Sequence, residues 1–482
     1  MSAQKSLAKN AVFNFIKCFS NIIFPIISFP YASRILLPQG IGAVNFANST
    51  VEYFILIAEL GIGTYAAREA ARIRDDRTAL TKFTKEILLI NFFTTILAYC
   101  LLILSLIFVS KFSDYRMLLI VCSTKVLFTT LGIEWLFVAK EEYGYITIRH
   151  GLFQIISLVL LFTLVKSKDD YLIYTAIGVF SNVGANIFNF IYSRKFINLF
   201  EKTPLEIKKH IKPICTFFGM RCADKVNNLL DTTMLGFISG DISVGFYSAA
   251  TKLSKMVREL ITSVIASFMP RSSYFLEKKN SDEYMVLVKK VCNVTFFFSI
   301  PAALGLFVLA EPLTILFCGE KYLAAVSTMQ LLSFCIVTMS LNSYLSNLIL
   351  TPNKLERFML YAQLVSLFVN LCLNYFFIKK WGVFGAGLAT LIVESVLPAV
   401  KLIPSWKYIK DKSNLINLLK ALIGSALMFF LIYFFFSNIT NNLLKIIISV
   451  FSGAFLYAIV EVILKHPTAT MILKMIAKRF TK

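Results

Sequence analysis

Charged side chains lie inside three long apolar stretches of the sequence, residues 10–33, 213–238 and 244–269. On a helical wheel of 100° per residue, the polar side chains of each stretch gather on one face and leave the other face apolar. Ammonium and guanidinium groups bind anionic oxygens strongly where the dielectric constant is low. The residues expected to bind an anionic ligand are Lys17, Arg221, Lys225, Lys252 and Lys255.

The alternative interpretation is that these charges form salt bridges between or within helices, for instance Lys255 with Glu259. In residues 213–238 and 244–269, five basic residues outnumber three acidic ones, Asp224, Asp231 and Glu259. An excess of positive charge within apolar segments favours a bound anion over a purely structural network, because buried charges need partners.

Apolar segments account for most of the chain. Of 482 residues, 57% are apolar and 14% aromatic, which is outside the range of soluble domains. A bilayer core about 30 Å thick is crossed by roughly 20 helical residues. We therefore predict an all-α polytopic membrane protein with about fourteen transmembrane helices. The predicted spans are 10–33, 41–63, 86–109, 116–139, 146–166, 171–193, 213–238, 244–269, 287–309, 323–350, 357–378, 382–404, 415–437 and 443–464.

Basic residues are unevenly distributed between the loops that join these spans. The net charge of +22 would suggest nucleic acid as the ligand of a soluble protein, but in a membrane protein it marks the cytoplasmic loops. Most Lys and Arg residues fall on one side when the spans alternate in direction. This bias predicts that both termini are cytoplasmic and argues against a nucleic-acid partner.

Other charged residues within the spans leave two interpretations open. Lys125 and Glu394 are isolated mid-span charges that either pair within the fold or line a polar path. Glu134 and Glu461 lie near the ends of spans and are expected to face solvent. The nine cysteines and three histidines form no metal-binding pattern, so we expect neither a metal site nor a cofactor.

The sequence contains a weak internal repeat. "QGIGAVNFANSTVEYF" resembles "GDISVGFYSAATKLSK" when Gly42 is aligned with Gly245. Because repeats commonly build transporters, we predict two parallel six-helix lobes around a central cavity. The predicted parts are residues 1–200 (N-terminal lobe), 201–410 (C-terminal lobe), 411–465 (two further spans) and 466–482 (a cytoplasmic amphipathic tail).

Four motifs resemble the polysaccharide repeat-unit (O-antigen or capsule) flippases of the multidrug/oligosaccharidyl-lipid/polysaccharide exporter superfamily. They are "YASRILLPQGIGAVNFANS", "ELGIGTYAAREAARIR", "GIEWLFVAKEEYGYITIR" and "FCGEKYLAAVSTMQLLSF". The resemblance covers nearly the whole chain. It implies alternating access in a bacterial plasma (inner) membrane and an undecaprenyl-diphosphate-linked oligosaccharide as cargo, moved from the cytoplasmic to the outer leaflet.

The polar residues fit that cargo. The cations above would bind the diphosphate, and amides would bind the sugar. The predicted amides are Asn14, Asn45, Asn48, Asn227 and Asn228. Glu52 and Asp224 lie at membrane depth on polar faces and are candidates for ion coupling. The expected partners are membrane lipids and, through the family, a polysaccharide polymerase and chain-length machinery.

Three other functions are weaker alternatives. A multidrug exporter of the same superfamily favours cationic drugs, which need an acidic cavity. A lipid II flippase differs only in the motifs quoted above. A membrane polysaccharide polymerase usually has a long outer loop with catalytic Arg and His residues. The predicted outer loops here are short and contain no His, and no catalytic or nucleotide-binding motif occurs, so we do not expect an enzyme.

The predicted topology can be tested by cysteine labelling in intact cells. Single cysteines at Ser167 and Asn441 should react with a membrane-impermeant maleimide added from outside, whereas cysteines at Asp76 and Ser281 should react only after the cells are permeabilised. Labelling with the opposite pattern would reverse the orientation.

Overall fold

Helices make up almost all of the computed structural model, which describes residues 7–201, 204–436 and 439–480, and no strand occurs among them. The first helices are α1 (Leu7–Glu59), α2 (Ile62–Arg72), α3 (Arg77–Phe108), α4 (Arg116–Leu131), α5 (Glu134–Ala139), α6 (Tyr143–Leu164), α7 (Tyr171–Val179), α8 (Asn186–Ser193) and α9 (Lys208–Ser239). They are followed by α10 (Asp241–Ala266), α11 (Met269–Glu277), α12 (Ser281–Val308), α13 (Ala310–Cys318), α14 (Val326–Tyr344), α15 (Glu356–Ile409), α16 (Lys412–Phe435), α17 (Asn442–Ile463) and α18 (Pro467–Phe480). Two 3₁₀ segments, η1 (Ser110–Ser113) and η3 (Glu320–Ala325), and two π-helical segments, η2 (Phe180–Gly184) and η4 (Leu345–Leu350), complete the set.

Fourteen membrane crossings can be traced in the described part of the chain. Ten helical segments are long and apolar enough to span a membrane, and two of them, Phe19–Arg72 and Glu356–Ile409, contain 54 residues each. At 1.5 Å per residue each is about 80 Å long, more than twice the bilayer core. Each bends sharply, at Leu37 (φ 59°) and at Gly382 (φ 56°), and thus crosses twice. The ten segments therefore provide twelve crossings, and the charged helices α9 and α10 add two more. The predicted all-α class and number of spans are confirmed.

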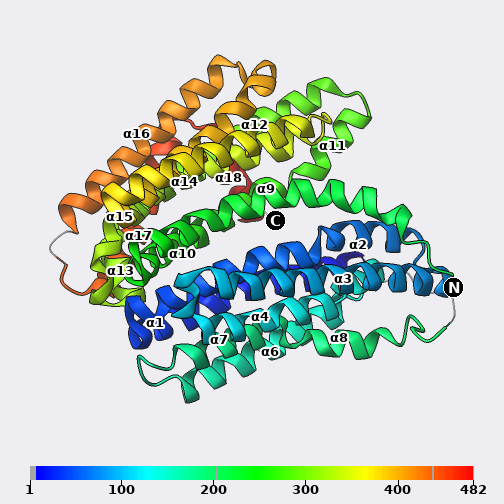
Figure 1. Cartoon of the computed structure of the whole chain (residues 1–482). Helices are drawn as coiled ribbons and strands as arrows, with labels where there is room; N and C mark the ends of the chain where they lie inside the picture. Colours follow the sequence, from blue (N-terminus) through cyan, green and yellow to red (C-terminus); the bar gives the residue numbers. More distant parts are fainter. Residues whose placement is uncertain (1–6, 202–203, 437–438, 481–482) are drawn as a thin grey trace. The chain divides into compact units, whose positions relative to one another are not determined.

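Contacts divide the chain into two compact units, residues 1–245 and 246–482. In the first unit α1 packs against α3, α4, α6 and α9, and Figure 1 shows these blue, cyan and green helices side by side. In the second unit α12 packs against α14, α16 and α18. The contacts place α9 with the first unit, whereas the predicted lobe boundary at residues 200 and 201 precedes this helix. The two-lobe arrangement therefore stays a prediction.

The glycines matched by the sequence repeat lie against each other in the first unit. A Cβ atom on Gly42 would come within 1.8 Å of the Asp241 carbonyl oxygen, and one on Gly245 within 2.0 Å of the Pro38 carbonyl oxygen. The alignment that matches Gly42 with Gly245 also matches Pro38 with Asp241, so the two contacts are reciprocal. These close contacts leave no room for a side chain at either glycine.

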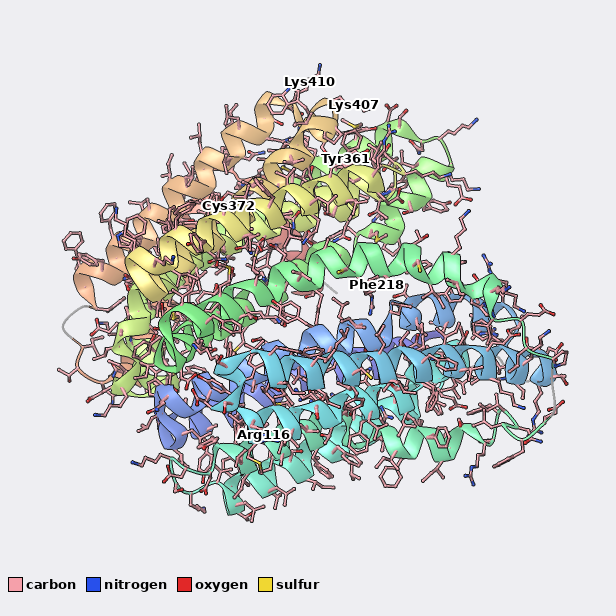
Figure 2. The ribbon with its side chains drawn as sticks, in the orientation of Figure 1. Arg116, Phe218, Tyr361, Cys372, Lys407 and Lys410 are labelled. Carbon is pink, nitrogen blue, oxygen red and sulfur yellow. The ribbon has the colours of Figure 1, made fainter. Side chains whose placement is uncertain are left out.

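Apolar side chains cover the outward faces of the helices. Phe108 and Phe451, for example, are 78% and 74% exposed, which is typical of a surface that faces lipid and not water. Basic residues lie instead at helix ends, as Lys407 and Lys410 do at the end of α15 (Figure 2). The chain is a multi-pass membrane protein. One expectation was wrong: Glu461, near the end of α17, is fully buried and does not face solvent.

A buried polar triad holds the start of α9 in the first unit. His210 accepts or donates a hydrogen bond on each ring nitrogen, with Nδ1 2.7 Å from the Tyr65 hydroxyl of α2 and Nε2 2.7 Å from Glu86 Oε2 of α3. The second Glu86 oxygen accepts the backbone N–H of Glu206 at 2.7 Å. The triad fixes the first turn of α9, the helix that carries Arg221 and Lys225.

We expect His210→Ala to lower the stability of the purified protein measurably, because it leaves the Glu86 carboxylate buried without its closest side-chain partner. Breaking a buried pair typically costs about 3–5 kcal/mol. Lys209, 3.4 Å from the same carboxylate, should keep the loss near the lower end. Thermal unfolding in detergent would measure the change. Lys208→Ala, an exposed neighbour, is the control, and equal melting temperatures for the two variants would contradict the structural role of the triad.

Candidate functional site

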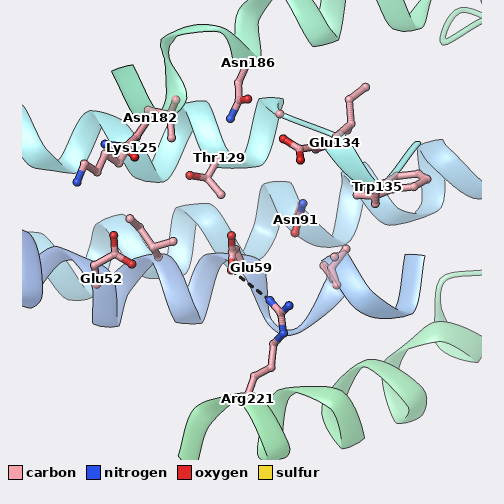
Figure 3. A pocket seen from close by; sticks show the side chains of 16 residues that line it. Glu52, Glu59, Asn91, Lys125, Thr129, Glu134, Trp135, Asn182, Asn186 and Arg221 are labelled. Carbon is pink, nitrogen blue, oxygen red and sulfur yellow. Dashed lines mark ion pairs between the residues drawn. The ribbon is translucent and has the colours of Figure 1, made fainter. Parts of the chain in front are cut away.

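A polar cavity of about 450 Å³ lies within the first unit (Figure 3). α1 and α2 supply Glu52, Glu59 and Gly63, while α3 supplies Asn91. The other polar lining residues come from α4, α5, η2, α8 and α9, and they are Lys125, Thr129, Glu134, Asn182, Asn186 and Arg221. The cavity therefore combines carboxylates, cations, amides and a hydroxyl among apolar helices.

Two cations of α9 meet carboxylates of α1 at this cavity. Lys225 Nζ lies 2.6 Å from Glu52 Oε2, and Arg221 Nη1 lies 4.0 Å from Glu59 Oε2 (the dashed line in Figure 3). The first distance is that of a charge-assisted hydrogen bond, whereas the second is too long for one. The sequence count of basic and acidic residues covered only the segments that form α9 and α10. It therefore left out Glu52 and Glu59 of α1, which balance part of the positive charge.

A break between α4 and α5 gives the cavity its opposite wall. Ile133 has φ 32° and ends the α4 helix, which leaves backbone carbonyls without their helical partners. Amides from α8 compensate, because Asn186 Nδ2 donates to the Phe128 carbonyl at 3.0 Å and Asn189 Nδ2 to the Gly132 carbonyl at 2.6 Å. A Cβ at position 132 would lie 2.7 Å from Asn186 Nδ2, so a larger residue there would displace this amide. The break positions Glu134 at the cavity.

Glu134 links three helices. Its Oε1 lies 2.5 Å from Lys17 Nζ of α1, and its Oε2 lies 3.4 Å from Arg149 Nη2 of α6. Glu134 was expected to face solvent, and its side chain is 39% exposed, but it also lines the cavity and pairs with two cations. Lys17, predicted to bind the diphosphate, is thus connected to the cavity through this carboxylate.

Cations outnumber carboxylates in and directly behind the wall of the cavity. Lys125, one of the residues left open by the sequence, donates to Asn48 Oδ1 at 2.6 Å and has no carboxylate among its recorded partners. The described carboxylates here are Glu52, Glu59 and Glu134, and the cations that line the cavity or pair with them are Lys17, Lys125, Arg149, Arg221 and Lys225. The site keeps a net positive charge after pairing.

The remaining predicted residues lie in different places. Asn48 reaches the cavity through Lys125, Asn227 is buried, and Asn228 donates to the Asp224 carbonyl within α9 at 2.8 Å. Asn45 is half-buried in α1, Asp224 is exposed, and the side chain of Asn14 lies outside the described residues. Lys252 and Lys255 belong to the second unit, where Lys255 lies 3.7 Å from Glu259 of its own helix.

The sequence interpretation missed four cavity residues: Asn91, Thr129, Asn182 and Asn186. A signal was available, because Asn182 and Asn186 are spaced by four residues in an otherwise apolar span and therefore share one helical face. The π-helical segment Phe180–Gly184 contains Asn182, and such segments often occur at functional sites. Asn91 has a buried Oδ1 without a hydrogen-bond partner in the described structure.

Comparisons with known proteins agree with this architecture. The family model described as "Polysaccharide biosynthesis protein" matches residues 7–276, and the model named MatE matches residues 218–376. Two proteins named "Putative O-antigen transporter" are each 24% identical to the chain: one from Shigella dysenteriae over 394 residues (81% of this chain, 98% of the relative) and one from Escherichia coli K12 over 409 residues (82% and 96%). The solved structure of the "Lipid II flippase MurJ, inward closed conformation" has the same fold, with a TM-score of 0.76, 18% identity and coverage of 94% of this chain and 98% of that one.

The fold and the charged intramembrane cavity define a polytopic membrane transporter. The chain belongs to the polysaccharide biosynthesis protein family, whose model matches more than half of its length. The resemblance to polysaccharide flippases of the wider exporter superfamily is thereby confirmed.

Mutations can separate the contribution of the Glu52–Lys225 pair to stability from its contribution to transport. Both side chains are partly exposed, at 26% and 42%, so the pair should stabilise the fold by no more than about 1 kcal/mol. We expect Lys225→Ala to leave the melting temperature nearly unchanged while transport falls. Reversing both charges, Glu52→Lys with Lys225→Glu, should restore the pair but not transport. Full activity of the reversed pair would assign it a structural role only.

Proposed function

We propose that the chain is a flippase that moves an undecaprenyl-diphosphate-linked oligosaccharide repeat unit from the cytoplasmic to the outer leaflet of the bacterial plasma membrane by alternating access. The observation that carries this proposal is the net positive charge of a cavity that is also rich in amides. A diphosphate carries about two negative charges, and its oxygens are the natural acceptors for Lys and Arg. The O-antigen transporter names of the relatives support the same cargo class.

Arg221 is the cation in the cavity best suited to exchange partners. Its guanidinium has five donors in a planar fork, and the 4.0 Å separation from Glu59 is not a hydrogen bond. A diphosphate can therefore bind Arg221 without first breaking a short contact. Lys225 must instead leave a carboxylate 2.6 Å away. Lys252 and Lys255 of the second unit, and Lys17 behind Glu134, remain proposed diphosphate ligands on the same chemical grounds.

Sugar hydroxyls suit the amide side of the cavity. Asn91 Oδ1 is buried and has no donor among the described residues, so a hydroxyl of the cargo would satisfy it. Asn182 and Asn186 line the same wall, and we add these three residues to the proposed sugar site. Asn14, Asn45, Asn48, Asn227 and Asn228 stay candidates from the sequence.

Glu52 and Asp224 remain the proposed coupling residues. The short contact between Glu52 and Lys225 gives a physical route: protonation of Glu52 would release Lys225 for the diphosphate. The lipid tail is proposed to stay in the bilayer during transport. Working partners of this kind of flippase, a polysaccharide polymerase and chain-length machinery, are likewise proposals.

Removal of the gene should cause lipid-linked repeat units to accumulate on the cytoplasmic leaflet, and complementation with Arg221→Ala should fail to clear them. Loss of a hydrogen bond to a charged group costs about 1.5–3 kcal/mol, equivalent to a roughly ten- to hundredfold weaker interaction with the diphosphate. Lys252→Ala and Lys255→Ala should also reduce the clearance of lipid-linked repeat units. Lys255→Arg should retain part of the activity because it keeps the charge.

Arg116→Ala, an exposed arginine at the start of α4, is the matched control (Figure 2). All variants are compared at equal abundance in the membrane. Normal surface-polysaccharide production by well-expressed Ala variants at Arg221, Lys252 and Lys255 would remove the diphosphate assignment. Accumulation of lipid II in place of repeat units would identify the other cargo class.

A further inference from the structure

A second recess lies on the first unit, between α6 and the end of α8. It has a volume of about 580 Å³ and is lined mainly by apolar side chains. Ring contacts hold its two sides together, with Tyr145 stacked on Tyr192 at 4.4 Å and Phe153 beside Phe188 at 5.8 Å between ring centroids. We call this recess the α6–α8 crevice. It shares no lining residue with the polar cavity.

Two buried polar groups in the lining of the crevice lack hydrogen-bond partners. The Arg149 residue is 8% exposed, and neither its Nε nor the hydroxyl of Tyr145 makes a hydrogen bond of ordinary geometry in the described structure, although the guanidinium lies 5.7 Å from the centroid of the Tyr145 ring. The other Arg149 nitrogens make long contacts, 3.4 Å from Nη1 to the Ala185 carbonyl and 3.4 Å from Nη2 to Glu134. Buried donors are nearly always paired, and an unpaired one costs about 1–3 kcal/mol. Because these two groups are neighbours, a single acceptor beside them would complete both.

The charge of the crevice specifies the kind of acceptor. None of the described residues that line it is acidic, and Lys195 contributes a second cation to the lining. The carboxylate that pairs with Arg149 is Glu134, and Glu134 also pairs with Lys17. One negative charge therefore balances only one of the two positive charges of Arg149 and Lys17. An anionic oxygen is the ligand that would complete the site.

The apolar walls of the crevice indicate which kind of molecule bears the anionic group. Ile148, Leu152, Phe188 and Ile191 line it and are exposed, as side chains that face lipid are in this protein. Arg149 lies six residues after the start of α6, about 9 Å along the helix. A cation near a helix end, beside a groove of apolar side chains, matches the junction of a lipid headgroup and its acyl chains.

We propose that the α6–α8 crevice binds an anionic glycerophospholipid of the surrounding membrane. The lipid phosphate accepts hydrogen bonds from Arg149 Nε and the Tyr145 hydroxyl, one acyl chain lies along Ile148, Leu152 and Ile191, and Lys195 supplies additional positive charge. Arg149 also contacts Glu134, a lining residue of the polar cavity. A phosphate that draws Arg149 toward the crevice weakens this contact, so bound lipid alters the charge balance of the transport cavity.

The test is lipid retention by the full-length protein, reconstituted in nanodiscs that contain phosphatidylglycerol and phosphatidylcholine in equal amounts. Native mass spectrometry of the released protein should show phosphatidylglycerol retained in preference. We expect Arg149→Gln and Tyr145→Phe each to reduce this retention about tenfold, because each removes one hydrogen bond to a charged group. Lys166→Gln, which alters an exposed lysine beyond the other end of α6, should leave retention unchanged.

Leu152→Trp fills the crevice without changing its charge and should also prevent retention. This variant and Tyr145→Phe keep the test informative if Arg149→Gln does not fold, because neither disturbs the Glu134 pair. Equal retention of the two lipids by the unmodified protein would overturn the proposal. So would unchanged phosphatidylglycerol retention in both Tyr145→Phe and Leu152→Trp.

Discussion

A charge in the middle of a membrane helix costs about 2.5–3.5 kcal/mol on insertion scales, and partners on other helices reduce this cost. In the first unit this requirement links the helices around the polar cavity. Lys225 of α9 meets Glu52 of α1, and Lys17 of α1 meets Glu134 of α5. The pairs hold segments that are distant in the sequence at fixed positions, and they do so where water can still reach them. Charges that are paired but partly hydrated can exchange partners at low cost, which is what a cavity for an anionic cargo needs.

The same constraint explains the irregular backbone around the cavity. Within a bilayer, carbonyl groups released by a helix break must find other donors. Gly132 and Ile133 interrupt the α4–α5 helix, and the amides of Asn186 and Asn189 bind the released carbonyls. One amide pair thus performs two tasks, because Asn186 also lines the cavity. The interruption turns Glu134 toward Lys17 and Arg149, and a continuous helix would not provide the same turn.

Arg149 connects the two recesses of the first unit. It belongs to the motif "GIEWLFVAKEEYGYITIR", as does Glu134, so one stretch of sequence supplies both members of an ion pair. One side of this pair lies on the polar cavity and the other on the apolar α6–α8 crevice. The lipids that surround a membrane transporter can also bind to it as ligands. A lipid bound in the proposed crevice would act on the charges of the polar cavity through this one side chain.

The all-α class, the number of crossings and the polar faces of the charged spans follow from the amino-acid sequence alone, because they depend on local hydrophobicity and helical periodicity. The sequence also indicated the family through contiguous motifs. The pairing of the charges is visible only in the folded protein, since Glu52 and Lys225 are far apart in the chain and their contact depends on how α1 and α9 pack. For the same reason the sequence alone did not place Glu134, Asn91 and Asn182 at one cavity. Local pattern specifies which face of a helix is polar, but the partner of that face is set by packing between helices that the pattern does not encode.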